Sequence, residues 1–183
     1  NIVYRNKAKI NDDIYVSGNL GDSYLGLLVL KNKLKLNHRL TKYFTNQYFM
    51  PNIQLKLAEQ VKKFANTSID ISDGLLADLD KMINNQKLSY KLFLKDIPIS
   101  NNLKKVLDFK KLSKINYVSN GDDYQVLFTA SNNKMGIIKK IASNYRVKIT
   151  KIGSIQSHVK KSSIIDGKNV QISLKNKGYF HKF

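Results

Sequence analysis

A strand turns into a helix within the stretch Ile69-Asp70-Ile71-Ser72-Asp73-Gly74-Leu75. Because side chains alternate along a strand, the two isoleucines share one face, and the first aspartate and the serine share the other. Asp73 and Gly74 then lead into a helix that contains Leu75, Leu76 and Leu79. The stretch therefore predicts two carboxylates and a hydroxyl at the end of a buried strand, beside a helix N-terminus.

The spacing of these residues is compatible with two different roles for the stretch. Backbone N–H groups at a helix N-terminus attract phosphate, and the carboxylates of Asp70 and Asp73 are ligands that suit Mg²⁺. The alternative is structural, because Ser72 or Asp73 can cap the helix without binding anything.

A second glycine turn, Asn120-Gly121-Asp122-Asp123-Tyr124, precedes another apolar run. Adjacent carboxylates repel each other, so they call for a cation or hydrogen-bond donors nearby. The alternative is an ordinary loop tip. A third turn, Gly18-Asn19-Leu20-Gly21-Asp22-Ser23, leads into a helix with Asp22 or Ser23 as its predicted cap.

The chain ends in an aromatic tail, Lys177-Gly178-Tyr179-Phe180-His181. Such a cluster packs on its own domain or stacks on a ring ligand. The three histidines lie far apart in the sequence and show no metal-ligand spacing.

The remaining pattern mixes helices and strands. Periodicity predicts helices in the ranges 21–34, 38–49, 53–64, 75–83, 101–114 and 135–145, and strands in the ranges 13–18, 67–72, 88–95, 124–129, 147–155, 159–165 and 170–174. We expect one α/β domain over residues 1–183, with a mostly antiparallel or mixed sheet.

Composition limits the possible functions. Lys and Arg number 32 against 13 acids, giving a formal charge of +19, but 29 of the basic residues are lysines. A nucleic-acid-binding protein is therefore an alternative, although base readout favours arginine. There is no cysteine, which excludes disulfides and thiolate sites. No apolar run reaches the ~18 residues of a membrane span, so we expect a cytoplasmic protein.

Together these segments resemble the thiamine-monophosphate kinase family of the aminoimidazole-ribonucleotide-synthetase-like superfamily. The stretch 65–75 looks like that family's central Asp-Ser-Asp motif, and 120–124 followed by 127–129 is similar to its Gly-Gly-Glu-Asp-Tyr strand. The turn at 16–23 and the tail at 178–181 match in the same order, so the resemblance runs from about Arg5 to Phe183. It implies a sheet with helices packed on one face.

The resemblance also implies an activity and a site: Mg²⁺-dependent phosphoryl transfer from ATP to thiamine monophosphate. The matching positions assign ATP binding to Arg5 and Ser72, Mg²⁺ to Asp70 and Asp73, and thiamine monophosphate to Asp122 and Tyr179. Phosphoryl transfer depends on positioning and charge neutralisation, which these residue types supply.

The chain also departs from the family's pattern. Asp122 replaces a glutamate, and Met50-Pro51-Asn52-Ile53-Gln54 lacks both arginines of an Arg-Pro-x-Pro-Arg run. The family carries an N-terminal domain that binds ATP and Mg²⁺ and that is absent from this chain. We therefore expect a separately encoded N-terminal half and a homodimer as partners, with an inactive remnant of the kinase as the alternative.

Overall fold

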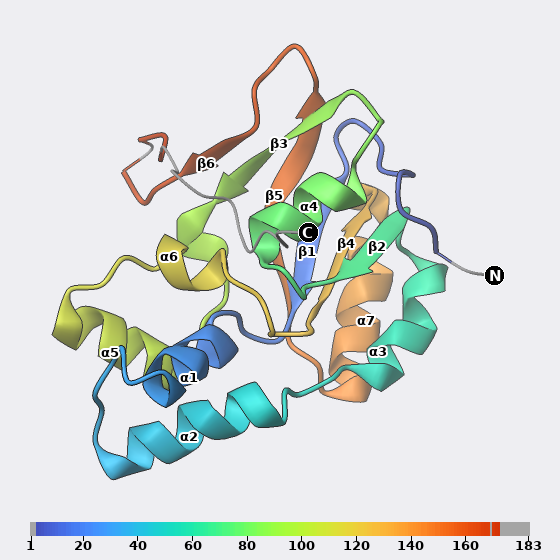
Figure 1. Cartoon of the computed structure of the whole chain (residues 1–183). Coiled ribbons are helices and arrows are strands. Elements are labelled where there is room, and N and C mark those ends of the chain that lie inside the picture. Colours follow the sequence, from blue (N-terminus) through green and yellow to red (C-terminus); the bar gives the residue numbers. More distant parts are fainter. Residues whose placement is uncertain (1–2, 169, 173–183) are drawn as a thin grey trace.

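The computed structural model describes residues 3–168 and 170–172. They form one six-stranded sheet with helices packed around it (Figure 1). The strands are β1 (Asp13–Ser17), β2 (Thr67–Asp70), β3 (Leu88–Phe93), β4 (Val126–Ala130), β5 (Ile149–Ser157) and β6 (Ser163–Ile165). The helices are α1 (Asp22–Leu30), α2 (His38–Phe49), α3 (Leu55–Gln60), α4 (Leu75–Met82), α5 (Asn101–Lys110), α6 (Ile115–Val118) and α7 (Met135–Tyr145), with short 3-10 helices η1 (Val61–Lys63), η2 (Leu94–Asp96) and η3 (Asn132–Lys134). No helix among the described residues has the length and apolar character needed to cross a membrane.

The sheet has the strand order β2-β4-β1-β5-β3-β6. Neighbouring strands are antiparallel except β3 and β6, which are parallel. The expectation of a mixed α/β domain with a mostly antiparallel sheet is therefore confirmed.

Helices cover both faces of the sheet, so the expectation that they cover one face is wrong. Ile14 and Val16 of β1 pack in a core with the leucines of α4, whereas Tyr15 packs on the other face with residues of α3 and α7. The ring of Tyr15 stacks on Phe128 with centroids 5.2 Å apart. Every residue of β1 is buried, because a central strand with apolar side chains on both faces needs a cover on each.

A third apolar cluster lies beside the sheet, where α1, α2, α5 and α6 pack on one another (Figure 1). Phe44 of α2 and Leu25 of α1 are fully buried in it. Gly26 lets these two helices approach closely, since a Cβ there would lie 2.1 Å from the carbonyl oxygen of Phe44. This cluster supports α1, the helix that follows the turn at residues 18–21.

Three loops emerge at one end of the sheet because of strand pairing. Asp70 at the end of β2 pairs with Val126 at the start of β4, and Val16 near the end of β1 pairs with Leu127. The loops at 71–74, 119–125 and 18–21 therefore meet at this end, below α4 in Figure 1.

Most predicted elements appear with shifted ends. The strand predicted at 67–72 ends at Asp70, and the helix predicted at 101–114 stops at Lys110, where Lys111 adopts a left-handed conformation (φ 53°). The strand predicted at 170–174 is represented in the described residues by an isolated bridge between Ile165 and Gln171.

Candidate active site

The loop between β2 and α4 is held by a buried carboxylate that lies further along the chain. One oxygen of Asp78, which is fully buried in the first turn of α4, accepts hydrogen bonds from the backbone N–H groups of Ser72 (2.9 Å), Asp73 (2.8 Å) and Gly74 (3.1 Å). No side chain caps α4 at its N-terminal residue Gly74. Ser72 and Asp73 therefore do not cap the helix, and the N–H groups of these two residues and of Gly74 are bonded to Asp78.

Lys81 connects the same carboxylate to the loop. Its ammonium lies 3.0 Å from the second oxygen of Asp78 and also forms an ion pair with Asp73. Asp73 thus projects from the loop with a cation already beside it.

The second glycine turn lies directly against this loop. The N–H of Asp122 donates to the carbonyl oxygen of Ser72 (3.0 Å), and the N–H of Tyr124 donates to that of Ile71 (2.8 Å). A Cβ on Gly121 would lie 1.8 Å from the carbonyl oxygen of Ser72, and one on Gly74 would lie 2.1 Å from that of Ser119. Both glycines are therefore required by close approach of the two backbones.

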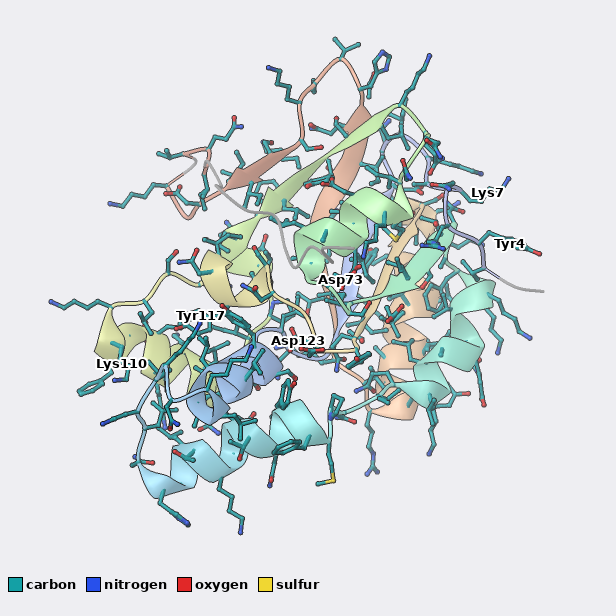
Figure 2. All side chains as sticks on the ribbon, in the orientation of Figure 1. Tyr4, Lys7, Asp73, Lys110, Tyr117 and Asp123 are labelled. Atoms are coloured by element: carbon teal, nitrogen blue, oxygen red, sulfur yellow. The ribbon has the colours of Figure 1, made fainter. Side chains whose placement is uncertain are left out.

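The two loops enclose a cavity of about 540 Å³. Its lining includes side chains from both loops and from α1 and α2: Tyr24, Leu27, Lys31, Tyr48, Ser72, Asp73, Asn120, Asp122 and Tyr124. Figure 2 shows Asp73 and Asp123 on these loops near the centre of the molecule. The structure thus brings together Ser72, Asp73 and Asp122, which sequence reasoning had selected from two separate segments.

The two adjacent carboxylates have different environments. Asp122 adopts a left-handed backbone conformation (φ 66°) and lines the cavity. Partial burial and the negative charge of Asp73 raise the pKa of Asp122 above its usual value. Non-glycine residues in this conformation are uncommon, and Asp122 is the member of the pair that lines the cavity.

Asp123 caps α1, whose N-cap residue Gly21 lies 102 positions earlier. Its carboxyl group accepts from the N–H groups of Gly21 (2.7 Å) and Ser23 (3.4 Å), at the N-terminus of α1. Burial raises the pKa of Asp123 to about 8, despite these hydrogen bonds. The predicted caps are therefore corrected: Asp22 is buried and accepts from Tyr43 and Ser100, because a carboxyl from the neighbouring loop already fills the cap position.

Asp70 lies beside a different cavity. It is exposed at the end of β2 and lines a space of about 490 Å³ with Ser68, Glu59 and Lys62. Tyr124 lines the cavity between the loops, and its pKa is raised by burial and then by the negative charges of Asp122, Asp70 and Asp73. Asp70 therefore adds to the negative field at the site without lining the cavity between the loops.

Arg5 lies at the other end of these elements. The carbonyl of Tyr4 accepts from Thr67 at the start of β2, and the N–H of Asn6 donates to Met82 at the end of α4. Figure 2 shows Tyr4 and Lys7, which flank Arg5, well away from Asp73. Arg5 does not line the cavity between the loops, and Tyr179 lies outside the described residues.

The carboxylates fit a metal ion that is shared with a ligand. Among residues 3–168 and 170–172, no group of three or more His, Asp or Glu side chains could hold a metal. Mg²⁺ usually takes one or two protein carboxylates and completes its coordination with water and substrate phosphates. Asp73 and Asp122, which line the same cavity, can supply that partial set.

Several residues of the site were missed by the sequence reasoning. Tyr24 and Tyr48, which line the cavity, belong to α1 and α2, and Lys31, which also lines it, directly follows α1. The approach of these two helices depends on the third apolar cluster. Asp78 gave a weak signal as an acid in the first turn of a helix, but its bonds to the preceding loop could not be inferred from spacing.

Comparisons with known proteins agree with this geometry. No family model matches the chain. It is 34% identical over 179 residues to the thiamine-monophosphate kinase of Buchnera aphidicola subsp. Acyrthosiphon pisum. The alignment covers 97% of this chain and 54% of that protein. It is 29% identical over 179 residues to the Escherichia coli (strain K12) enzyme, with the same coverage.

Solved structures give the same result. The thiamine-monophosphate kinase of Stenotrophomonas maltophilia K279a superposes with a TM-score of 0.78 at 26% identity, over 90% of this chain and 52% of that one. The structure of AaThiL complexed with AMPPCP and TMP superposes with a TM-score of 0.76 at 25% identity, over 97% of this chain and 54% of that one. The chain spans about half the length of the curated relatives it matches. In sequence and in fold, the chain is similar to the thiamine-monophosphate kinases over about half of their length.

Proposed function

We propose that this chain is the C-terminal part of a thiamine-monophosphate kinase. In the reaction, a phosphate oxygen of thiamine monophosphate bonds to the γ-phosphorus of ATP and the bond from that phosphorus to the bridging oxygen breaks, giving ADP and thiamine diphosphate. The observation that carries the proposal is the single cavity formed by the loops of Ser72-Asp73 and Asn120–Tyr124. The similarity to AaThiL, which was solved with AMPPCP and TMP, supports it.

The acceptor end of the cavity suits a cationic ring. Thiamine monophosphate carries a positive thiazolium, which the carboxylate of Asp122 attracts. Tyr24, Tyr48 and Tyr124 line the same cavity and offer aromatic faces for stacking or cation–π contact. We assign Tyr179 to this substrate as well, on the match of the tail alone.

The phosphate end is assigned to Ser72, Asp73 and Asp70. The Ser72 hydroxyl can donate to an ATP phosphate, and we keep Arg5 as an ATP ligand on its motif match. Asp70 and Asp73 would hold Mg²⁺, which when bound neutralises charge on the phosphate oxygens. Because the N–H groups of this loop are already bonded to Asp78, phosphate recognition here depends on side chains and the cation.

The chain would act with the part of the enzyme that it does not span. We propose that an N-terminal half, on the same or a separate chain, supplies further ATP and Mg²⁺ contacts to this single domain. A homodimer and a cytoplasmic location follow from the same family assignment.

The test is phosphotransfer in a reconstituted enzyme. The chain is combined with the N-terminal half of a relative, and thiamine diphosphate is measured with ATP, Mg²⁺ and thiamine monophosphate. Asp73→Asn should abolish turnover and Asp122→Ala should raise the KM for thiamine monophosphate, whereas Lys139→Met on exposed α7 should change neither.

Two results would count against the proposal. Unchanged turnover in both site variants would show that Asp73 and Asp122 are wrongly assigned to the active site. A folded, reconstituted protein with no turnover and no Mg²⁺-dependent ATP binding would identify the chain as an inactive remnant.

A further inference from the structure

A second polar cavity, of about 480 Å³, lies away from the candidate active site. Four lysines from four different segments converge on it, and we call it the lysine pocket: Lys95 in η2, Lys104 in α5, Lys114 before α6 and Lys148 before β5. It shares no lining residue with the cavity between the two loops. Any ligand here would therefore occupy a separate site.

Two lysines of this pocket, Lys114 and Lys148, are held by neutral partners. The ammonium of Lys114 is half-buried and donates to the carbonyl oxygens of Leu94 (2.7 Å) and Lys95 (3.3 Å). The ammonium of Lys148 donates to the side-chain oxygen of Asn19 (2.8 Å). None of the three ion pairs among the described residues includes a lysine of the pocket. The positive charges thus converge without being paired.

Electrostatics at Lys114 show the cost of this arrangement. The pKa of Lys114 is lowered to about 8, chiefly by burial; Asp96 acts in the opposite direction, and the charges of Lys148 and Lys104 contribute to the lowering. Asp96 and Asp108 are the acids that line the pocket, and neither lies within ion-pair distance of a lysine there. An anion bound among the four lysines would relieve their mutual repulsion.

The walls indicate the shape of the ligand. Pro98, Leu107 and Leu112 line the pocket beside the lysines. The volume lies within the range of about 300–1,000 Å³ that is typical of small-molecule sites. Lysine ammoniums act as mobile point charges that suit phosphate, while the apolar walls suit an organic body.

We propose that the lysine pocket binds a small phosphate monoester, with its phosphate among the four lysines and its organic group against the apolar wall. The glycine turn that the sequence analysis selected lies at its border: Asn19 holds Lys148, and the N–H of Leu20 donates to the carbonyl of Pro98 (2.9 Å). This assignment is independent of the kinase proposal.

The test is calorimetric titration of the whole chain with phenyl phosphate, inorganic phosphate and benzoate. We expect saturable binding of phenyl phosphate, weakened at least 10-fold by Lys114→Met or Lys148→Met and less than 2-fold by Lys140→Met, which removes the same charge from exposed α7. Asp73→Asn, in the other cavity, should leave this binding unchanged. The failure of the kinase proposal would therefore not affect the result.

Proton uptake gives a second readout. Since an anion raises the pKa of Lys114, binding at pH 8 should take up protons, seen as a heat that depends on the ionisation enthalpy of the buffer. Lys148→Met, at an exposed position, carries the test if Lys114→Met does not fold.

Three results would overturn the proposal. Equal weakening by Lys140→Met would show attraction to net charge only. Equal affinity for inorganic phosphate and phenyl phosphate would show that the pocket does not recognise the organic group. Equal affinity for benzoate and phenyl phosphate would show that it does not recognise the phosphate.

Discussion

The backbone N–H of Asp122 donates to the carbonyl oxygen of Ser72 across 3.0 Å, so two motifs that are far apart in the sequence form one unit. The bond links main-chain atoms and does not depend on either side chain. Perturbing the contact between the loops should therefore affect folding and ligand binding together.

Gly121→Ala should separate the two loops. The new Cβ would lie 1.8 Å from the carbonyl oxygen of Ser72, and backbone cannot rotate away as a side chain can. We expect a loss of about 1–3 kcal/mol in the free energy of unfolding, measured by urea denaturation. Gly136→Ala is the matched control, because nothing lies within 4 Å of a Cβ there; equal loss in both variants would refute the close-approach argument.

Asp78→Ala should destabilise the loop that carries Ser72 and Asp73. It leaves three backbone donors without their acceptor, at about 1–3 kcal/mol for each that stays buried. Asp108→Ala removes an exposed acid from α5 and should change the unfolding free energy by less than about 0.5 kcal/mol. Hydrogen exchange at residues 72–74 would locate the effect, and unchanged protection in Asp78→Ala would contradict it.

Asp123 should make folding stability fall as pH rises. Its pKa is raised by burial to about 8 in the folded protein, against an ordinary value of 3.8. A raised folded pKa means that the folded state binds the proton more tightly, so this contribution is complete below pH 4 and is lost as the pH rises to 8. Asp22 and Asp122 shift in the same direction.

Asp123→Asn tests that assignment, because asparagine keeps a neutral acceptor for the N–H of Gly21. Thermal unfolding between pH 5 and 8 should show a flatter dependence in the variant than in the parent chain. A slope as steep as that of the parent would mean that Asp123 is not the titrating group.

Lys81→Met should strengthen divalent-cation binding. Lys81 is paired with Asp73, and a metal ion at Asp73 must compete with that ammonium. We expect a several-fold lower Kd for Mn²⁺ by electron paramagnetic resonance, and weaker binding in Asp73→Asn. Lys139→Met serves as the charge control; the same gain there would show a general effect of net charge.

The sequence was sufficient for the class of fold and for the choice of the two loops. Both follow from apolar runs next to glycine turns, which are local signals. The second helical layer was not predicted, because the alternation in β1 does not reveal that Tyr15 also needs a cover. The roles of Asp78 and Asp123 were also hidden, since each carboxyl bonds to a segment whose position depends on the finished fold.

The residues assigned to ligands from the sequence also fall into two groups, those that the structure brings into one cavity and those that it does not. Ser72, Asp73 and Asp122 meet because strand pairing fixes where their loops emerge. Asp70 shares the strand but lies at a different cavity, and Arg5 lies at the far end of the same elements. Motif order along a chain thus does not establish that the residues share one cavity.

The close approach at Gly74 and Gly121 bears on how this sequence can evolve. Selection on the architecture acts on the two glycines, where any side chain would collide with backbone. The hydrogen bond that places Asp122 belongs to the main chain, so its side chain can change without loss of that bond. Lineages can therefore retune ligand preference at this site by single substitutions while the loop geometry is inherited unchanged.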